Sequence, residues 1–268
     1  MIVISRSIQK YWAIFKTQLI NSLAYPGDLF SRSLTIVVFL WVFAQLWRVT
    51  YQSVGQPAIS GLTYRETLWY LLLAETIVLS KPKLSTTIAT TVKDGSVAYL
   101  LNKPYNFLLY QISIGLGDSV MQMGFNALVG GTIVWLLVGS PPALWGWPLV
   151  LVAVIVAWLI DFCIAAIIGL AAFVTEEISA FEWIYQKITF ILGGLLIPLD
   201  FYPDWLRSIA LSLPFAYTIY GPARLFVDPA LSRFALLLAG QLAWLLLLGG
   251  LLTFLYRRGV TWLTINGG

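Results

Sequence analysis

The sequence predicts an all-α integral membrane protein with about six transmembrane helices. Three observations lead to this fold class. The chain is 59% hydrophobic and only 10% charged, its mean hydropathy is +0.85, and its apolar residues gather in continuous runs of membrane-spanning length. Soluble domains carry about 25% charged residues, and a bilayer-crossing helix needs about 20 mostly apolar residues. The runs also lack the alternation typical of lipid-facing β-strands, which favours helices.

Six runs qualify as spans, of which the second and fifth are short. No separate soluble domain fits between them, so residues 1–268 are interpreted as a single transmembrane domain. The expected spans are approximately Leu29–Trp47, Leu62–Leu79, Leu108–Val138, Leu149–Val174, Trp183–Ile197 and Phe234–Tyr256.

The segment before the first span, about residues 5–25, has a different pattern. Apolar residues recur in it at helical spacing, whereas Arg6, Lys10 and Thr17 fall elsewhere, which predicts an amphipathic helix in the headgroup region. Tyr25–Asp28 contains a proline and a glycine that break this helix. A plain extension of the first span is the alternative. The apolar residues are Ile8, Tyr11, Trp12, Phe15 and Leu19.

The loops predict the orientation, because Lys and Arg are enriched on the cytoplasmic side of membrane proteins. With the N-terminus inside, all the lysines outside the fifth span lie on the inner side, together with Arg257 and Arg258. The outer side holds five arginines spread over longer stretches: Arg48, Arg65, Arg207, Arg224 and Arg233. Both termini are therefore expected in the cytoplasm.

The inner loop at 81–104 is expected to hold a short surface helix. Gly95 provides a sharp break, Ser96 is a suitable N-cap, and Val97–Asn102 forms a helical turn that stops before Pro104. A short, half-apolar helix of this kind suits docking in a partner's groove. A solvated connector is the alternative.

A broken outer hairpin is expected at 198–230, before the last span. The stretch is too polar and too rich in proline to span, yet too apolar for a free loop. Pro203 and Asp204 can open a short helix that Pro214 ends, and two short helices would dip into the outer leaflet. The alternative is a degenerate seventh span, which would leave Arg257 and Arg258 outside.

Several function classes are excluded by composition. The chain has no histidine and a single cysteine, Cys163, within an apolar run. This removes histidine-based metal sites, Ser–His and Cys–His dyads, and an intramolecular disulfide framework. The net charge of +4 without a basic stripe argues against a nucleic-acid partner. A phosphate-binding loop of the Gly-x-x-x-x-Gly-Lys-Ser/Thr type does not occur.

Together these features resemble the permease subunit of ABC-2 type ABC transporters, over essentially the whole chain. The start of the chain is similar to a subgroup that often occurs as paired unlike permeases with one ATPase. In the inner loop the resemblance assigns ATPase coupling to Lys93, Asp94, Gly95, Ser96, Leu100, Leu101 and Pro104, and in the next inner loop to Glu176 and Glu177. In the outer hairpin it assigns the gate to Pro198, Tyr202, Pro203, Asp204, Trp205, Pro214 and Arg224.

The resemblance implies a multi-pass protein of the cell membrane (inner or plasma) that forms half of an export pathway. It implies no enzymatic activity and no cofactor for this chain, because ATP and Mg²⁺ would bind to a separate ATPase subunit dimer. A second permease chain, the same or related, would complete the pathway, with membrane lipid around it.

Five ionisable residues fall within the expected spans, where charges are costly and often functional. Mutual pairing is the preferred interpretation, and for Asp161 close packing beside Ala153, Ala157, Ala165 and Gly169; a substrate path or proton relay is the alternative. An ion-gradient-driven secondary transporter using Glu75, Asp118 and Asp161 is the second function class, and a membrane-embedded enzyme the third. The five residues are Arg32, Glu75, Asp118, Asp161 and Lys187.

Overall fold

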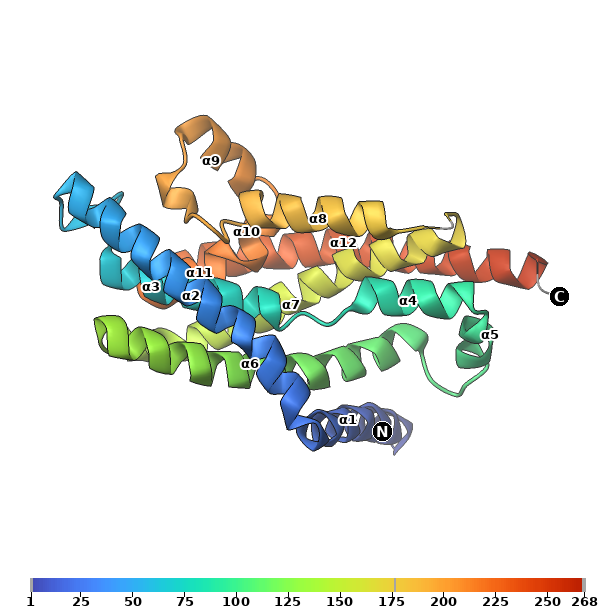
Figure 1. Cartoon of the computed structure of the whole chain (residues 1–268). Helices are drawn as coiled ribbons and strands as arrows, with labels where there is room; N and C mark the ends of the chain where they lie inside the picture. Colours follow the sequence, from blue (N-terminus) through green and yellow to red (C-terminus); the bar gives the residue numbers. More distant parts are fainter. Residues whose placement is uncertain (1, 176, 267–268) are drawn as a thin grey trace.

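The computed structural model, which describes residues 2–175 and 177–266, is an elongated helical bundle (Figure 1). Four of its helical stretches are long and apolar enough to cross a membrane: Leu29–Val54, Phe107–Val138, Leu144–Phe173 and Leu231–Gly259. The prediction of a helical, multi-pass membrane protein is therefore confirmed. The short helix α5 lies at one end of the bundle, at the right of Figure 1, and α9 lies toward the opposite end. We call these the α5 end and the α9 end.

The first two helices are separated by the proline break. Helix α1 (Ile2–Ala24) ends before Pro26, which occupies the first turn of α2 (Pro26–Val54). Helix α1 packs along the start of α6, where Gly117 lies directly beneath Gln18 and the carbonyl of Phe15. Of the predicted apolar face of α1, Trp12 stays exposed whereas Phe15 is half-buried.

A small hairpin connects α2 to α3 at the α9 end. Strands β1 (Ala58–Ile59) and β2 (Leu62–Thr63) pair antiparallel, and α3 (Tyr64–Leu79) follows at once. Thr63 and Glu66 form a capping box that satisfies backbone amides at the start of α3. The helix therefore begins at Tyr64, two residues after the predicted start of the second span at Leu62.

Helix α3 is continued toward the α5 end by α4 (Leu84–Lys93) after a break around Pro82, and α5 (Ser96–Leu101) turns away from it (Figure 1). Gly95 permits this turn, because its φ of 75° is in the left-handed region that other residues rarely adopt. The predicted short helix in this loop is present. Its N-cap position is Gly95 rather than Ser96, which is already the first helical residue.

Long helices form the body of the bundle. Helix α6 (Phe107–Val138) is capped by the side chain of Asn106, which accepts from the amide of Leu109. Helix α7 follows a short turn, η1 (Leu144–Gly146), and the last helix is α12. The remaining bounds here are Trp147–Leu170 for α7, Ala171–Phe173 for η2 and Leu231–Asn266 for α12.

Helix α8 (Ser179–Leu192) is followed by a chain of short helices at the α9 end. Helix α9 begins at Asp204 after Pro203, as predicted, whereas Pro214 starts a further helix instead of only ending one. The segment after α8 thus holds more short helices than the two predicted. Their bounds are Leu199–Phe201 for η3, Asp204–Leu211 for α9, Pro214–Thr218 for α10 and Tyr220–Val227 for α11.

The prediction of about six spans is confirmed only for the four long stretches. Helices α3 and α8 have 16 and 14 residues, which at about 1.5 Å per residue is less than the roughly 30 Å of the hydrocarbon core. The fifth span was predicted at Trp183–Ile197, but α8 starts at Ser179 and stops at Leu192, before Gly193 and Gly194. Crossing of the membrane by these two elements stays a prediction.

The buried core runs between α3, α7, α11 and the flanking long helices. Tyr70 of α3 is completely buried, and its hydroxyl donates to the carbonyl of Gly194 at 2.6 Å. This contact joins α3 to the turn after α8. Gln241 of α12 donates to the carbonyls of Ala153 and Tyr217, at 2.9 and 3.0 Å. The core therefore includes polar contacts that hold the helices in a defined rotation.

Candidate functional site

The predicted coupling loop forms a corner between α4 and α5 at the α5 end. The carboxylate of Asp94 accepts from the amide of Ser96 at 2.9 Å, so it satisfies a backbone donor at the start of α5. Hydrogen bonds from Ser96 lower the pKa of Asp94. Helix α5 exposes Tyr99, a residue that is 64% exposed, and partly buries Leu100. The corner is thus a hydrogen-bonded turn with an exposed aromatic ring.

The loop between α7 and α8 lies next to this corner. Lys93 Nζ lies 3.4 Å from Glu177 Oε2. The other oxygen of Glu177 accepts from the amides of Ile178 and Ser179, and these backbone bonds, with the charge of Lys93, lower the pKa of Glu177. Two predicted coupling residues from different loops, Lys93 and Glu177, therefore meet. Glu176 lies outside the described residues, as does the side chain of Leu101.

Helix α1 contacts the far end of the same loop. Lys10 Nζ donates to the carbonyl of Pro104 at 2.6 Å, and the hydroxyl of Tyr11 accepts from the amide of Asn106 at 2.9 Å. Lys103 lies 4.1 Å above the ring of Tyr99, and its hydrogen bond with Tyr99 raises the pKa of the lysine. The loop is therefore held on one side by α1 and on the other by Glu177.

Helix α4 is joined to α8 by hydrogen bonds. Ser85 and Thr86 both donate to Glu182 Oε1, at 2.5 and 2.8 Å. On its other side, α4 packs against α7 at Gly169, where a Cβ atom would stand 2.8 Å from Cβ of Ile88. Only glycine fits this close approach. The predicted stripe of small residues on α7 thus contacts α4 at this point.

A buried ionic cluster lies at the break between α3 and α4. Lys81 Nζ is 2.5 Å from Asp161 Oδ1, and the hydroxyl of Tyr185 donates to the same oxygen. The side chains of Lys81 and Asp161 are 16% and 8% exposed. A cavity of about 470 Å³ adjoins the cluster and reaches Glu182 and Thr189. The partner of Asp161 is therefore a loop lysine that the sequence analysis assigned only to the inner surface.

The other intramembrane residues have different environments. Arg32 Nη1 lies 3.5 Å from Asp118 Oδ2, so these two are brought together. Glu75 is buried, and its Oε2 has no hydrogen-bond partner in the described part of the chain. Lys187 is exposed on α8, with Nζ about 5.4 Å from the ring centre of Trp183 and 5.5 Å from that of Phe190. The structure does not join these five residues into one site.

A buried network of uncharged polar groups was missed by the sequence analysis. Ser33 of α2 donates to Asn126 Oδ1 at 2.6 Å, and Gln122 donates to both of them. Asn126 also donates to Ser80 at 3.3 Å. The network joins α2, α6 and the end of α3. The available signal was Gln122 and Asn126, four residues apart in an apolar span, where amides seek partners.

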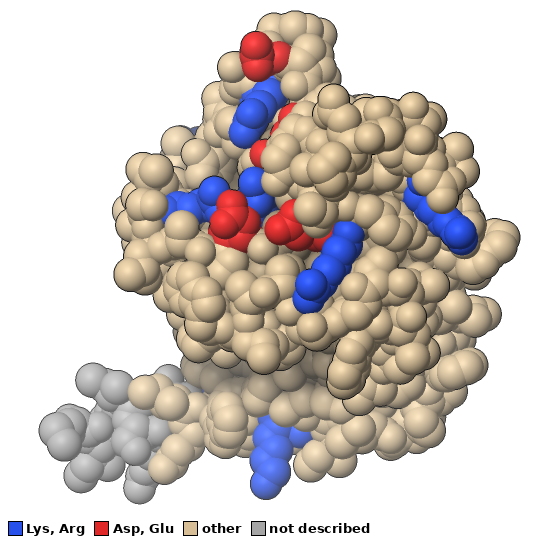
Figure 2. All heavy atoms as spheres, turned by 90° about the vertical axis from the view of Figure 1, so that its left-hand side faces the viewer, with Lys and Arg blue, Asp and Glu red and all other residues tan. Residues whose placement is uncertain are grey.

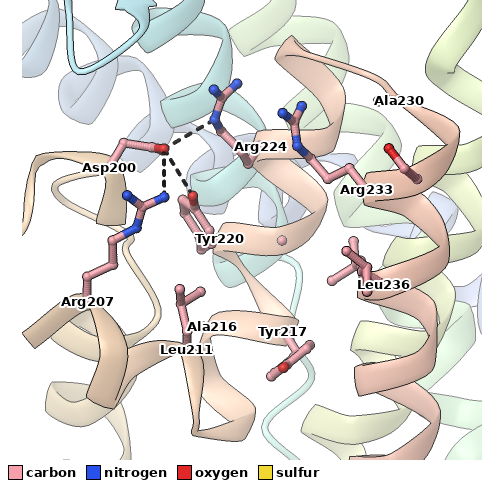
Figure 3. A pocket seen from close by; sticks show the side chains of 13 residues that line it. Asp200, Arg207, Leu211, Ala216, Tyr217, Tyr220, Arg224, Ala230, Arg233 and Leu236 are labelled. Atoms are coloured by element: carbon pink, nitrogen blue, oxygen red, sulfur yellow. Dashed lines mark hydrogen bonds and ion pairs between the residues drawn. The ribbon is translucent and has the colours of Figure 1, made fainter. Parts of the chain in front are cut away.

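The α9 end carries a second cluster of charges. Asp200 accepts from the hydroxyl of Tyr220 at 3.2 Å and forms ion pairs with Arg207 and Arg224, at 3.5 and 3.4 Å. Figure 2 shows the acidic and basic side chains of this face interspersed around a hollow. Figure 3 shows Arg207, Tyr220 and Arg224 directed toward the Asp200 carboxylate. Arg224 and Asp200 belong to the same site, although only Arg224 was predicted there.

The cluster extends from α11 to α12. Arg224 Nη1 lies 3.2 Å from Asp228, and Arg233 Nη1 lies 2.7 Å from the same carboxylate. An open cavity of about 620 Å³ lies between η3, α9, α10, α11 and the start of α12 (Figure 3). Asp228 and Arg233 were not predicted as site residues, because their connection to Asp200 through Arg224 depends on how the short helices fold back.

The remaining predicted hairpin residues are distributed over the segment. Pro198 and Pro214 are buried, whereas Pro203 and Asp204 are exposed. Trp205 is 66% exposed, and the hydroxyl of Tyr202 donates to the carbonyl of Ile191 at 2.8 Å, tying the hairpin to α8. Within the described ranges, no group of three or more His, Cys, Asp or Glu side chains is placed to hold a metal ion.

Comparison with known proteins gives one match that covers nearly all of the chain. A family model described as "ABC-2 family transporter protein" matches residues 20–267. A search of curated proteins found no matching sequence.

Proposed function

We propose, because this chain belongs to the ABC-2 family of transporter membrane proteins, that it is the transmembrane permease subunit of an ATP-driven exporter and forms half of its pathway. A separate ATPase subunit dimer would bind ATP and Mg²⁺ and hydrolyse the nucleotide. A second permease chain, the same or related, would form the other half. This chain then does mechanical work only: it receives movement from the ATPase and changes the arrangement of its spans.

In this proposal the α5 end faces the cytoplasm. The charge distribution supports the orientation, since the loop after α3 and the end of α12 are basic and lysine and arginine favour the inner side. Lys83, Lys93 and Lys103 lie in that loop, and Arg257 and Arg258 lie toward the end of α12. Helix α9 and the cavity beside it then face outward.

The observation that carries the coupling role is the attachment of the α4–α5 corner to three other elements. Lys93 contacts Glu177, Ser85 and Thr86 hold Glu182, and Lys10 holds Pro104. A push on α5 would therefore displace α4 together with α8 and the end of α7, instead of bending a free loop. Packed helices that shift as a group are a common means of switching between two states.

The exposed side of α8 supports a position for the second permease chain. Lys187 and Gln186 are exposed there beside Trp183. Charged residues in spans rarely face lipid; they face protein or a water-filled cavity instead. The surface of α8 would thus border the partner permease or the pathway between the two chains.

Site-specific crosslinking tests the coupling role. A photo-crosslinking amino acid is introduced at Tyr99, which is exposed on α5, and as a control at Trp145, which is 60% exposed near the opposite end. The tagged full-length chain is co-expressed with a candidate ABC ATPase subunit and irradiated in membranes. We expect an adduct with the ATPase from position 99 and none from position 145. Equal adducts from both positions, or an assembled complex that gives none from 99, would contradict the proposal.

A secondary transporter is favoured by one observation, the buried Glu75 with an unpartnered carboxylate oxygen in the described structure. Asp118 and Asp161 each have a basic partner instead. Proteoliposomes that hold this chain alone distinguish the two functions. Cargo movement driven by a proton gradient without nucleotide, abolished in Glu75→Gln, would support the secondary transporter.

A further inference from the structure

The cavity at the α9 end has a charged part and an apolar part. Arg224 and Arg233 direct their guanidinium groups to the same end of it, and Leu236, Tyr217 and Leu211 lie further along (Figure 3). Its volume of about 620 Å³ lies within the roughly 300–1,000 Å³ of ligand-binding pockets. The cavity therefore matches a ligand with one polar end and one apolar end.

The charged part has an excess of positive charge. Arg207, Arg224 and Arg233 face two carboxylates, Asp200 and Asp228. Both contacts of Arg233 with Asp228 use Nη1, to its carboxylate and to its backbone carbonyl. Because a guanidinium carries five N–H donors in a planar fork, Arg233 keeps donors on Nε and Nη2 within the described structure. Such forks favour phosphate oxygens.

The start of the apolar stretch of α12 places the cavity at the expected depth of the lipid headgroups. The apolar stretch of α12 begins at Leu231, which places Arg233 in its first turn. Leu236 lies three residues further into the stretch, about 4.5 Å along the helix axis, and is 76% exposed. Trp205 on α9 is 66% exposed, and tryptophan is enriched at membrane interfaces. With α12 crossing the membrane from Leu231, the arginines would meet the headgroup layer and Leu236 the hydrocarbon.

We propose that this cavity binds an anionic amphiphile, with a phosphate group between Arg207, Arg224 and Arg233 and a hydrocarbon chain along Leu211 and Leu236. The ion pairs with Asp200 and Asp228 hold the three arginines in place. The proposal does not depend on ATPase coupling, because the cavity and its charges belong to this chain alone.

Lipid titration of the purified full-length chain in detergent, followed by native mass spectrometry, tests the site. The probes are phosphatidylglycerol, phosphatidylcholine and inorganic phosphate. We expect phosphatidylglycerol to bind on the order of tenfold more tightly than phosphatidylcholine, because a charge-assisted contact is gained without a cationic headgroup competing for it. Inorganic phosphate at millimolar concentration should not displace it.

Two variants from different helices identify the cavity. Arg233→Gln on α12 and Arg207→Gln on α9 should each weaken phosphatidylglycerol binding on the order of tenfold. Arg48→Gln is the matched control, since Arg48 is exposed on α2 outside the cavity lining, and it should bind as the unchanged protein does. A third variant, Leu236→Gln, leaves every ion pair in place. It changes only the apolar part of the cavity and should still weaken phosphatidylglycerol binding.

Three results would overturn the proposal. Equal affinity for phosphatidylglycerol and phosphatidylcholine would mean that the arginines do not select an anionic headgroup. An equal loss in Arg48→Gln and in both cavity variants would indicate a diffuse surface effect. Displacement of the lipid by inorganic phosphate at millimolar concentration would make the cavity an oxyanion site without an apolar part. ATPase stimulation is not measured here, so a failure of the coupling role leaves these outcomes unaffected.

Discussion

At the scale of single residues, Asp161 is held by groups from two other elements. Lys81 comes from the break between α3 and α4, and Tyr185 comes from α8. A buried carboxylate that loses its cation is left as an uncompensated charge, so removal of one partner of such a pair costs more than the pair contributes. The cluster therefore joins α7 to α8 and to the break that precedes α4.

This environment predicts a large effect for Lys81→Met. The substitution leaves Asp161 without its cation, and we expect a loss of about 3 kcal/mol in the free energy of unfolding. The double variant Lys81→Met with Asp161→Asn should recover more than half of it, because no charge stays buried. Urea unfolding in detergent micelles measures both values.

Lys187→Met is the control for this experiment. Lys187 is exposed and forms no ion pair in the described structure, only ring contacts, so a change of about 0.5 kcal/mol or less is expected. If Lys81→Met is no more destabilised than Lys187→Met, the pair with Asp161 does not hold α7.

At the scale of elements, the position of α4 depends on its close approach to α7. Helix α4 has few buried side chains of its own, Leu84, Ile88 and Ala89. Gly169 lets the backbone of α7 lie against Ile88 and the carbonyl of Ser85. The amphipathic α4 is thus held by one tight contact on α7 and by the hydrogen bonds to Glu182.

Gly169→Ala should separate these two helices. Its Cβ would stand 2.8 Å from the branch point of Ile88 and 3.0 Å from a backbone oxygen, and neither can move without α4. We expect a loss of about 1–3 kcal/mol in the free energy of unfolding. ATPase stimulation in the assembled complex should fall with it, as measured by phosphate release.

The matched control is Gly124→Ala on α6, where nothing lies within 4 Å of the added Cβ. Replacement of a helical glycine by alanine without a clash stabilises by up to about 1 kcal/mol. Equal effects of the two substitutions would show that the contact of α4 with α7 is not tight.

At the scale of the whole molecule, the two ends of the bundle carry different chemistry. The α5 end has the corner with Lys93 and Lys103, and the α9 end, which faces the viewer in Figure 2, has the arginine cavity. An exporter needs such an asymmetry, because its fuel is on one side of the membrane and its product leaves on the other. The orientation of the chain is therefore the property on which the proposed coupling role depends.

Cysteine labelling in intact cells tests this orientation. The only cysteine, Cys163, is buried, so Cys163→Ala gives a background without thiols. We expect Trp145→Cys to react with a membrane-impermeant maleimide in intact cells. Tyr99→Cys should react only after the cells are opened. Labelling of Tyr99→Cys in intact cells would place the α5 end outside and contradict the proposed coupling.

The sequence by itself determined the membrane class, the proline break before α2, the short helix after Gly95 and the start of α9 at Asp204. These depend on composition and on residues close together in the chain, where hydropathy and backbone preference decide. Only the tertiary structure decided that Lys81 meets Asp161, that Gln122 and Asn126 join three helices, and that Arg207, Arg224 and Arg233 border one cavity. These contacts depend on the rotation and crossing of helices, which the packing of side chains distant in sequence sets.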